Sequence, residues 1–214
     1  TAGLIQKYPE RFTAALPMCG VLSGGVATWN TALDSEFAFE VLIAPGRGLQ
    51  IVNIADPETN LEIAEEALTI AQNSAQGRAR IALAAALSDL PGWFTPLTSE
   101  PDPTDFDSQE ANQFLWDEGV DFPFVFAFRA ELESRATGNP SWNTGVDYKR
   151  QLERSIDRAE VEALYEEAGL NLNSDLDALQ DAARISADPP AVRYLEQNII
   201  FNGDIGIPVL TLHT

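Results

Sequence analysis

The sequence has 214 residues, 45% of them hydrophobic, which allows one large domain, or one and a half, with a sizeable core. Its 33 acidic residues against 13 lysines and arginines give a formal net charge of −20, which argues against nucleic acid and anionic membranes as partners. The lone cysteine, Cys19, excludes an internal disulfide, and we find no signal peptide and no bilayer-spanning apolar run. The compartment, cytoplasmic or secreted, stays open.

The chain opens with a helical segment followed by a short apolar run. The apolar residues between Leu4 and Tyr8 share one side of a helix, which Pro9 ends because its ring removes a backbone donor. The run Ala14 to Cys19 lies between turn residues and is closed by Gly20. Such a run is typical of a strand buried on both faces.

Two seven-residue segments with nearly the same letters are each predicted to start a helix. TWNTALD ends at Asp34, and SWNTGVD ends at Asp147. In each, a threonine three residues before the aspartate (Thr31 and Thr144) completes the spacing of a capping box. The threonine hydroxyl and the aspartate carboxylate would then satisfy free amides at the helix start.

Helices are expected over most of the remaining chain. Four phenylalanines alternate between 122 and 128, which is compatible with a strand, but the run continues into helix formers. A helix interrupted near Pro123 is the preferred interpretation. Other helices are predicted at 56–71, 78–87, 109–119, 159–168, 175–183 and 189–195. After an Asn-Gly turn, IPVLTLH at 207–213 is a second short strand with buried character.

The two ends of the chain resemble the α/β-hydrolase family. A helix, the turn YPERF and a strand ending in CG are similar to the segment after that family's nucleophile elbow, and IPVLTLH is similar to the strand before its acid-bearing loop. The resemblance implies a mostly α fold, in which a helical cap, or lid, is flanked by two parallel core strands of an α/β-hydrolase sheet. It assigns 1–20 to the core, 21–206 to the cap insertion and 207–214 to a core strand.

The function implied by the resemblance is hydrolysis of a carboxylic ester or similar acyl bond by a parent enzyme. Its Ser-His-Asp triad would lie outside this chain, so the chain alone is expected to hold no catalytic residue. The implied partners are a small acyl or ester substrate and the rest of the α/β-hydrolase core, with no cofactor. The alternative is an acidic helical binding or interaction domain without catalytic activity.

Four side chains have the chemistry of a catalytic group, but their sequence positions argue against that role. The GxSxG motif has a glycine two residues before its serine, whereas Gly20 lies three residues before Ser23. Cys19 is expected to pack in the core. His213 precedes the place of the family's acid, whereas the catalytic histidine follows it, so packing or a supporting hydrogen bond is expected. Thr1 leads into a helix, whereas enzymes with an N-terminal nucleophile begin with a strand.

No metal site is expected, because the acid clusters at 102–107 and 171–175 lack the glycine and glutamate of a calcium loop and no zinc spacing occurs. Large aromatic residues are mostly core, but as a set they are compatible with an apolar pocket beneath a cap. The predicted substrate-lining residues are Cys19, Gly20, Trp29, Trp93, Phe124 and Trp142.

Overall fold

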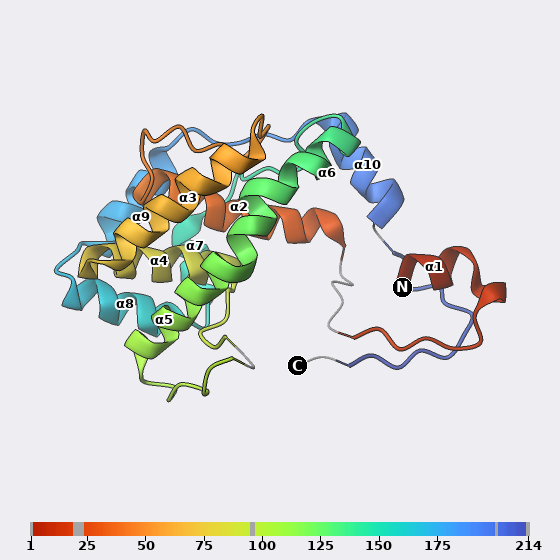
Figure 1. The fold of residues 1–214 in the computed structure, drawn as a ribbon, viewed down its shortest axis with the longest axis horizontal. Coiled ribbons are helices and arrows are strands. Elements are labelled where there is room, and N and C mark those ends of the chain that lie inside the picture. Colours follow the sequence, from red (N-terminus) through yellow and green to blue (C-terminus); the bar gives the residue numbers. More distant parts are fainter. Residues whose placement is uncertain (1, 19–23, 95–96, 200, 213–214) are drawn as a thin grey trace.

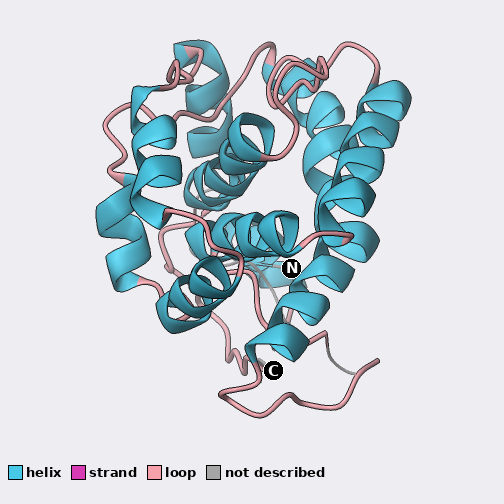
Figure 2. Cartoon of the chain, turned by 90° about the vertical axis from the view of Figure 1, so that its left-hand side faces the viewer, coloured by secondary structure: helices cyan, strands magenta, loops and turns pink. Residues whose placement is uncertain are grey.

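Helices form nearly all of the regular structure in the computed structural model, which describes residues 2–18, 24–94, 97–199 and 201–212 (Figures 1 and 2). The α-helices are α1 (Ala2–Lys7), α2 (Gly25–Leu42), α3 (Pro57–Gln72), α4 (Ala75–Ser88), α5 (Phe106–Trp116), α6 (Arg129–Ala136), α7 (Tyr148–Arg154), α8 (Arg158–Glu167), α9 (Leu172–Asp181) and α10 (Pro189–Ile199). A 3-10 turn, η1, spans Pro9–Arg11, and two π-helical segments, η2 (Asp117–Asp121) and η3 (Pro123–Phe128), join α5 to α6. In these ranges no helix has both the length and the apolar character needed to cross a bilayer.

The core of the helical body (residues 25–199) is built around α4. This helix packs against α2, α3, α5, α7 and α8, and its residues from Ile81 to Leu87 are almost completely buried. Its alanine-rich sequence suits this position, because small side chains let neighbouring helices approach from several sides. At the α3–α4 corner a side chain on Gly77 would lie 2.0 Å from the Ala71 carbonyl oxygen, so only glycine fits there.

The two ends of the chain form an arm (residues 2–18 and 201–212) beside the helical body (Figure 1). The predicted pair of parallel core strands is wrong, since the described residues contain no strand. The two end segments do run side by side, with isolated parallel bridges joining Ala15 to Val209 and Met18 to Leu212. Cys19 and His213, the last residues of the two predicted strands, lie outside the described ranges.

The exposure of these segments explains why they form no sheet. Leu16 is 51% exposed, Met18 66% and Leu210 65%, whereas burial on both faces was expected. Strands of that kind need further strands beside them and helices on their faces, and the described residues supply neither. Three backbone hydrogen bonds, to the carbonyl oxygens of Pro208, Ala15 and Pro17, hold the two segments together.

The aromatic segment near Pro123 confirms the helical interpretation and adds a detail. From Phe106 to Ala136 the backbone stays helical, but 117–121 and 123–128 adopt the wider π-helical winding. Proline inside an α-helix loses one hydrogen bond and its ring crowds the preceding turn. The wider winding around Pro123 accommodates both effects, and π-helical turns of this kind often occur at functional sites.

The prediction that both repeated segments cap a helix is wrong in the details. The helix α2 begins at Gly25, so TWNTALD lies inside it and Asp34 is buried. In the second segment Asp147 itself is the N-cap of α7, since its Oδ1 accepts the Arg150 amide at 3.1 Å. Thr144 lies in the turn before it, where Gly145 has the positive φ of 83° that glycine tolerates.

We predict that Asp147→Ala lowers the free energy of unfolding by about 1 kcal/mol, because α7 loses its cap. Thr144→Ala should cost less than about 0.5 kcal/mol, since this exposed threonine caps nothing. Urea unfolding of the two variants measures both values. The opposite order would restore Thr144 as the cap.

Candidate functional site

The most buried charge of the helical body is Arg129 at the start of α6. Its guanidinium, with no exposed surface, lies 3.0 Å from a Glu36 oxygen on α2 and donates a hydrogen bond to Ser141 Oγ at 3.2 Å. Burial raises the pKa of Glu36, and the Arg129 charge opposes this rise, so the ionised carboxylate depends on this guanidinium. A buried charge pair of this kind is stable only when both members stay partnered.

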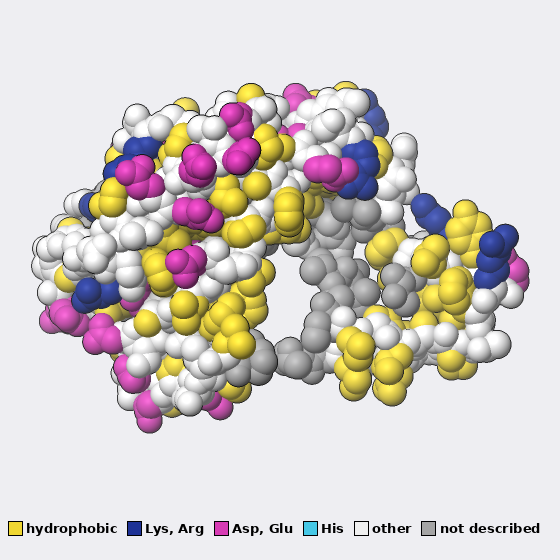
Figure 3. Space-filling view, viewed as in Figure 1, with side chains coloured by type: hydrophobic (Ala, Val, Ile, Leu, Met, Phe, Trp, Pro, Cys, Tyr) yellow, Lys and Arg dark blue, Asp and Glu magenta, His cyan; other side chains and the backbone are white. Residues whose placement is uncertain are grey.

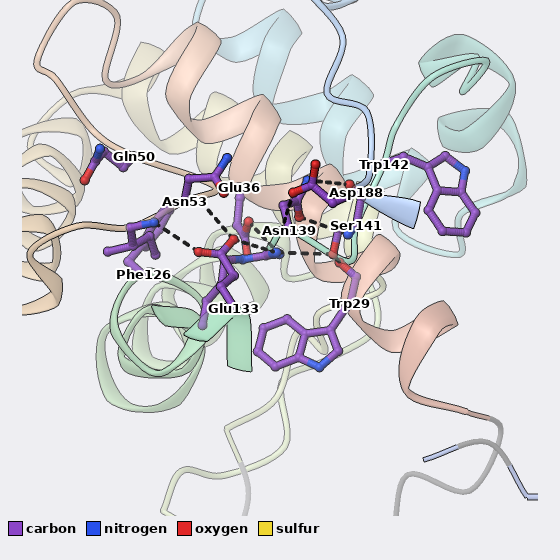
Figure 4. Close-up of polar contacts among 12 residues, drawn as sticks. Trp29, Glu36, Gln50, Asn53, Phe126, Glu133, Asn139, Ser141, Trp142 and Asp188 are labelled. Atoms are coloured by element: carbon purple, nitrogen blue, oxygen red, sulfur yellow. Dashed lines mark hydrogen bonds and ion pairs between the residues drawn. The ribbon is translucent and has the colours of Figure 1, made fainter. Parts of the chain in front are cut away.

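Further hydrogen bonds extend this polar network into two loops and to Asp188, just before α10. The Glu133 carboxylate accepts the backbone amides of Asn53 and Ile54 at 2.9 and 3.0 Å. The Asn139 side chain accepts the Ser141 amide at 2.9 Å, and the Asn139 amide donates to Asp188 at the same distance. The network therefore joins α2, α6, the 50–54 loop, the 139–142 loop and the start of α10 (Figure 4).

The network has the chemistry of a structural element rather than of a catalytic site. Ser141 is fully buried, accepts from Arg129 and donates to the Trp29 carbonyl oxygen at 3.1 Å. Its hydroxyl therefore has neither a free position nor a base beside it, and a serine nucleophile needs both.

The two repeated segments meet in space on this network. The Asn30 side chain accepts the Trp142 amide at 3.0 Å, and Asp34 accepts the Tyr148 hydroxyl at 3.0 Å. Asn143 donates to the same hydroxyl at 2.9 Å. The similar letters thus form contacts between α2 and the loop before α7, which is a role that helix capping does not explain.

A cavity of about 320 Å³ opens on the other side of α2 and is the candidate binding site. Its wall combines the N-terminal half of α2, the end of α4 and the two π-helical segments. The lining residues are Ala27, Thr28, Thr31, Ala32, Ser88, Asp89, Leu90, Asp121 and Phe124. A volume of this size lies at the lower end of the usual range for small-molecule sites.

The aromatic part of the cavity wall is supported by the buried network. The Phe124 ring, 39% exposed, stacks on Trp29 with the ring centroids 4.6 Å apart and an interplanar angle of 16°. Trp29 is buried, and the Arg129 guanidinium lies 5.0 Å from the centroid of its ring. The orientation of Phe124 is therefore set by a chain of contacts that ends at the buried ion pair.

A group of buried carboxyls lies along α5, η2 and α8, and one of its members, Asp121, lines the cavity. Burial raises the pKa of Glu110 to about 7, of Glu160 to about 8 and of Asp121 to about 6, and raises that of Asp117 well above its usual value. One side-chain oxygen each of Glu110, Glu160 and Asp117 has no hydrogen-bond partner among the described residues. Protonated carboxyls explain this arrangement, because a buried carboxylate without a partner is costly.

Two other kinds of site have less support in the structure. A more polar hollow of about 410 Å³ lies between α4 and α7, but its lining contains no aromatic residue and its arginines, Arg150 and Arg154, are exposed. Across the described ranges no group of three or more His, Cys, Asp or Glu side chains is placed to hold a metal ion.

The structure separates the residues predicted to line a substrate pocket. Phe124 lines the cavity and Trp29 supports it from behind. Trp93 lies in a different aromatic group, where its carbonyl oxygen accepts the Trp116 indole at 2.9 Å, and Trp142 lies in the loop that contacts Asn30. The other two predicted residues, Cys19 and Gly20, fall outside the described ranges, as does Ser23.

The polar residues of the cavity were not predicted from the sequence. Thr28 and Thr31, three positions apart, share one face of a helix, but their segment was interpreted as a cap. Asp89 ends α4 with a left-handed φ of 56°, a conformation that no sequence pattern at this position indicated. Asp121 gave no signal because its environment depends on the π-helical turn.

Comparison with known proteins adds one relative. Over 159 residues the chain is 33% identical to a protein named o-phthalyl amidase from Xanthobacter agilis, and the aligned part covers 69% of this chain and 33% of that protein. The chain thus spans about a third of the length of this relative. No family model matches the chain, and no solved structure matches it. An amidase is a hydrolase, so the expectation of a hydrolase has support at this coarse level.

Removal of the buried guanidinium should strongly destabilise the fold. We expect Arg129→Met to lower the free energy of unfolding by about 3–5 kcal/mol, because Glu36 is left buried without a partner. On the same helix, Arg135→Met removes an exposed ion pair with Glu131 and should cost less than about 1 kcal/mol. Chemical unfolding compares the two variants. Equal costs would show that the buried pair does not hold the body together.

The raised carboxyl pKa values predict that stability falls as the pH rises. Between the usual values of 3.8 to 4.5 and the folded values of about 6 to 8, the native state keeps protons that the unfolded chain has lost. The free energy of unfolding must then decrease with pH through this window. Urea midpoints at about pH 5 and about pH 8 measure the slope.

Two variants test the origin of this slope. Glu160→Gln should flatten it, since a glutamine carries no charge at either pH, whereas Glu62→Gln on the surface of α3 should leave it unchanged. A slope that both variants leave intact would assign the pH dependence to other groups.

Proposed function

We propose that this chain is the helical cap portion of a hydrolase that cleaves an acyl bond, an amide or a carboxylic ester. The observation that carries the proposal is the 33% identity to a protein named as an amidase over 69% of the chain. The catalytic triad of serine, histidine and acid would belong to polypeptide outside this chain, since that relative is about three times longer than the aligned part.

The path of the chain supports the role of a cap. The segments that lead into and out of the helical body lie side by side, and the amides of Leu210 and Leu212 each donate a hydrogen bond at 3.1 Å to the opposite segment. An insertion into another domain needs neighbouring entry and exit points of this kind, because its two ends must join one continuous scaffold.

The surface of the arm fits a position against further protein. Hydrophobic side chains are spread over much of the visible face of the arm, as Figure 3 shows. Leu16, Met18, Leu210 and Leu212 are each at least half exposed. Groups of exposed apolar side chains on a soluble protein are typical of interfaces. We assign this surface to contact with the catalytic part of the same enzyme.

The mechanism assigned to the cap is to shape the substrate pocket and exclude water. Phe124 offers an apolar wall at the cavity, and the stack with Trp29 holds the ring in place. A serine in the catalytic part would attack the acyl carbon, with a histidine as the base and backbone amides stabilising the oxyanion. A closed cap strengthens these interactions, because it removes competing water.

Hydrolysis assays test the proposal with this chain and with a longer polypeptide that contains it. The chain alone should not hydrolyse a 4-nitrophenyl ester or a 4-nitroanilide above the blank rate, whereas the longer polypeptide should hydrolyse at least one of them. In the longer polypeptide, Phe124→Ala should lower kcat/KM about tenfold, equivalent to about 1.4 kcal/mol of lost transition-state stabilisation.

The control for this assay is Phe128→Ala, which removes a ring that is 67% exposed and does not line the cavity. It should leave kcat/KM within about twofold. Turnover by the chain alone that disappears on changing Thr1, Ser23 or Cys19 would contradict the proposal. So would a longer polypeptide without any activity toward esters and amides, which would favour a binding domain.

A further inference from the structure

The polar side chains of the cavity beside Phe124 all end in oxygen atoms that can accept hydrogen bonds. Thr28, Thr31 and Ser88 contribute hydroxyls, and Asp89 and Asp121 contribute carboxyls. The lining contains no lysine, arginine or histidine, so every charge that faces the cavity is negative. An anionic ligand would be repelled here, and a cationic ligand would be attracted.

Neither of the two carboxylates has an ion-pair partner in the part of the chain that the structure describes. Among the described residues, no lysine or arginine lies within 4.0 Å of Asp89 or Asp121, although eight ion pairs elsewhere join different basic residues to acids. The charge of Asp121 raises the pKa of Asp117, on its own segment, and the pKa of Glu36, on α2. The Arg129 charge lowers the pKa of Glu36. Asp89 also borders the polar hollow lined by Arg150 and Arg154, but neither arginine forms an ion pair with it, so the negative charge at the cavity is only partly offset.

An aromatic ring completes the set of groups. One face of Phe124 is taken by Trp29, at 4.6 Å between centroids, so a ligand in the cavity meets the remaining face or edge. An aromatic face beside carboxylates is the combination that proteins use for alkylammonium groups, because the ring quadrupole attracts a weakly hydrated cation. Thr31 is exposed and available to accept a hydrogen bond from such a group.

We propose that this cavity binds an organic ammonium group carried on a small apolar body. If the chain caps an amide hydrolase, as proposed above, the ligand is the amine product, which takes up a proton after the C–N bond is cleaved, since an amide nitrogen itself carries no charge. This identification rests on the proposed function, whereas the ammonium site itself rests on the cavity. The volume of about 320 Å³ accommodates a benzylammonium-sized group.

Calorimetric titration of this chain with three probes of similar size tests the proposal. At about pH 8, benzyltrimethylammonium should bind at least about tenfold more tightly than benzyl alcohol, and benzoate should bind least. Affinity for the ammonium probe should rise as the pH increases through about 6, where Asp121 ionises, and should fall with added salt. The affinity for benzyl alcohol should follow neither change.

Variants identify the groups responsible. Asp89→Asn is the first choice, since Asp89 is exposed and asparagine tolerates its left-handed φ of 56°. It should weaken ammonium binding about threefold or more and leave benzyl alcohol unchanged. Phe124→Leu should weaken ammonium binding similarly, while Glu62→Gln, which removes one charge on α3, should have no effect. Circular dichroism confirms that each variant is folded.

Three outcomes would overturn the inference. Benzyl alcohol could bind as tightly as the ammonium probe, no probe could bind at millimolar concentration, or Asp89→Asn could leave ammonium binding unchanged. Because these titrations involve no turnover, they separate the two proposals. If the titrations show no ammonium binding, the hydrolysis assays still test the proposed hydrolase. If the hydrolysis assays show no activity, the measured ammonium affinity still stands.

Discussion

The fold depends on the need to keep one buried guanidinium partnered. A charge without solvent contact costs several kcal/mol unless an opposite charge and hydrogen-bond acceptors surround it. The two terminal nitrogens of Arg129 meet this requirement with Glu36 and the Ser141 hydroxyl, and the guanidinium also lies over the face of Trp29, whereas Nε has no hydrogen-bond partner among the described residues. These partners come from α2 and from the loop before α7, so both segments must pack against α6 around the guanidinium. The constraint thus sets the relative position of segments that are far apart in the sequence.

The same constraint reaches the candidate site through aromatic contacts. Arg129 lies over Trp29, Trp29 stacks on Phe124, and Phe124 forms part of the cavity wall. Binding sites are more precise when their side chains are held by packing behind them, since less conformational entropy is lost on binding. The cavity here has a rigid ring on one side and charged and hydroxyl groups on the others. This arrangement is compatible with a cap that orients part of a substrate.

The sequence predicted the helical content well and the long-range features poorly. Apolar spacing and proline positions located the helices around 57–72, 75–88 and 189–199, because those signals are local.

The burial of Arg129 could not be predicted, since an arginine in a helix is normally exposed and its partner is 93 residues away. The capping prediction was wrong because two similar segments have different structures. TWNTALD lies inside α2, whereas SWNTGVD lies before α7. The parallel strands were wrong because apolar runs become buried strands only when other elements cover them. Phe124 lines a cavity, and its role toward a substrate stays a prediction. Asp121 and Asp89 depend on the π-helical winding and on a left-handed helix end, which no local pattern indicates.

The π-helical winding between 117 and 128 makes this part of the helix tolerant of changes in its number of residues. Each residue of an α-helix turns the next by about 100°, and a π-helical turn fits an extra residue into nearly the same rotation. Deletion of a single residue from one of these segments would therefore let it return to ordinary winding while α6 keeps nearly the same phase. The same deletion in a regular α-helix would rotate everything beyond it by about 100°. Phe124, inside the stretch, would change its direction, whereas Arg129 on α6 would keep its own. Length variation in this short stretch is therefore a local variable, through which related chains could alter the cavity wall while every helix stays in place.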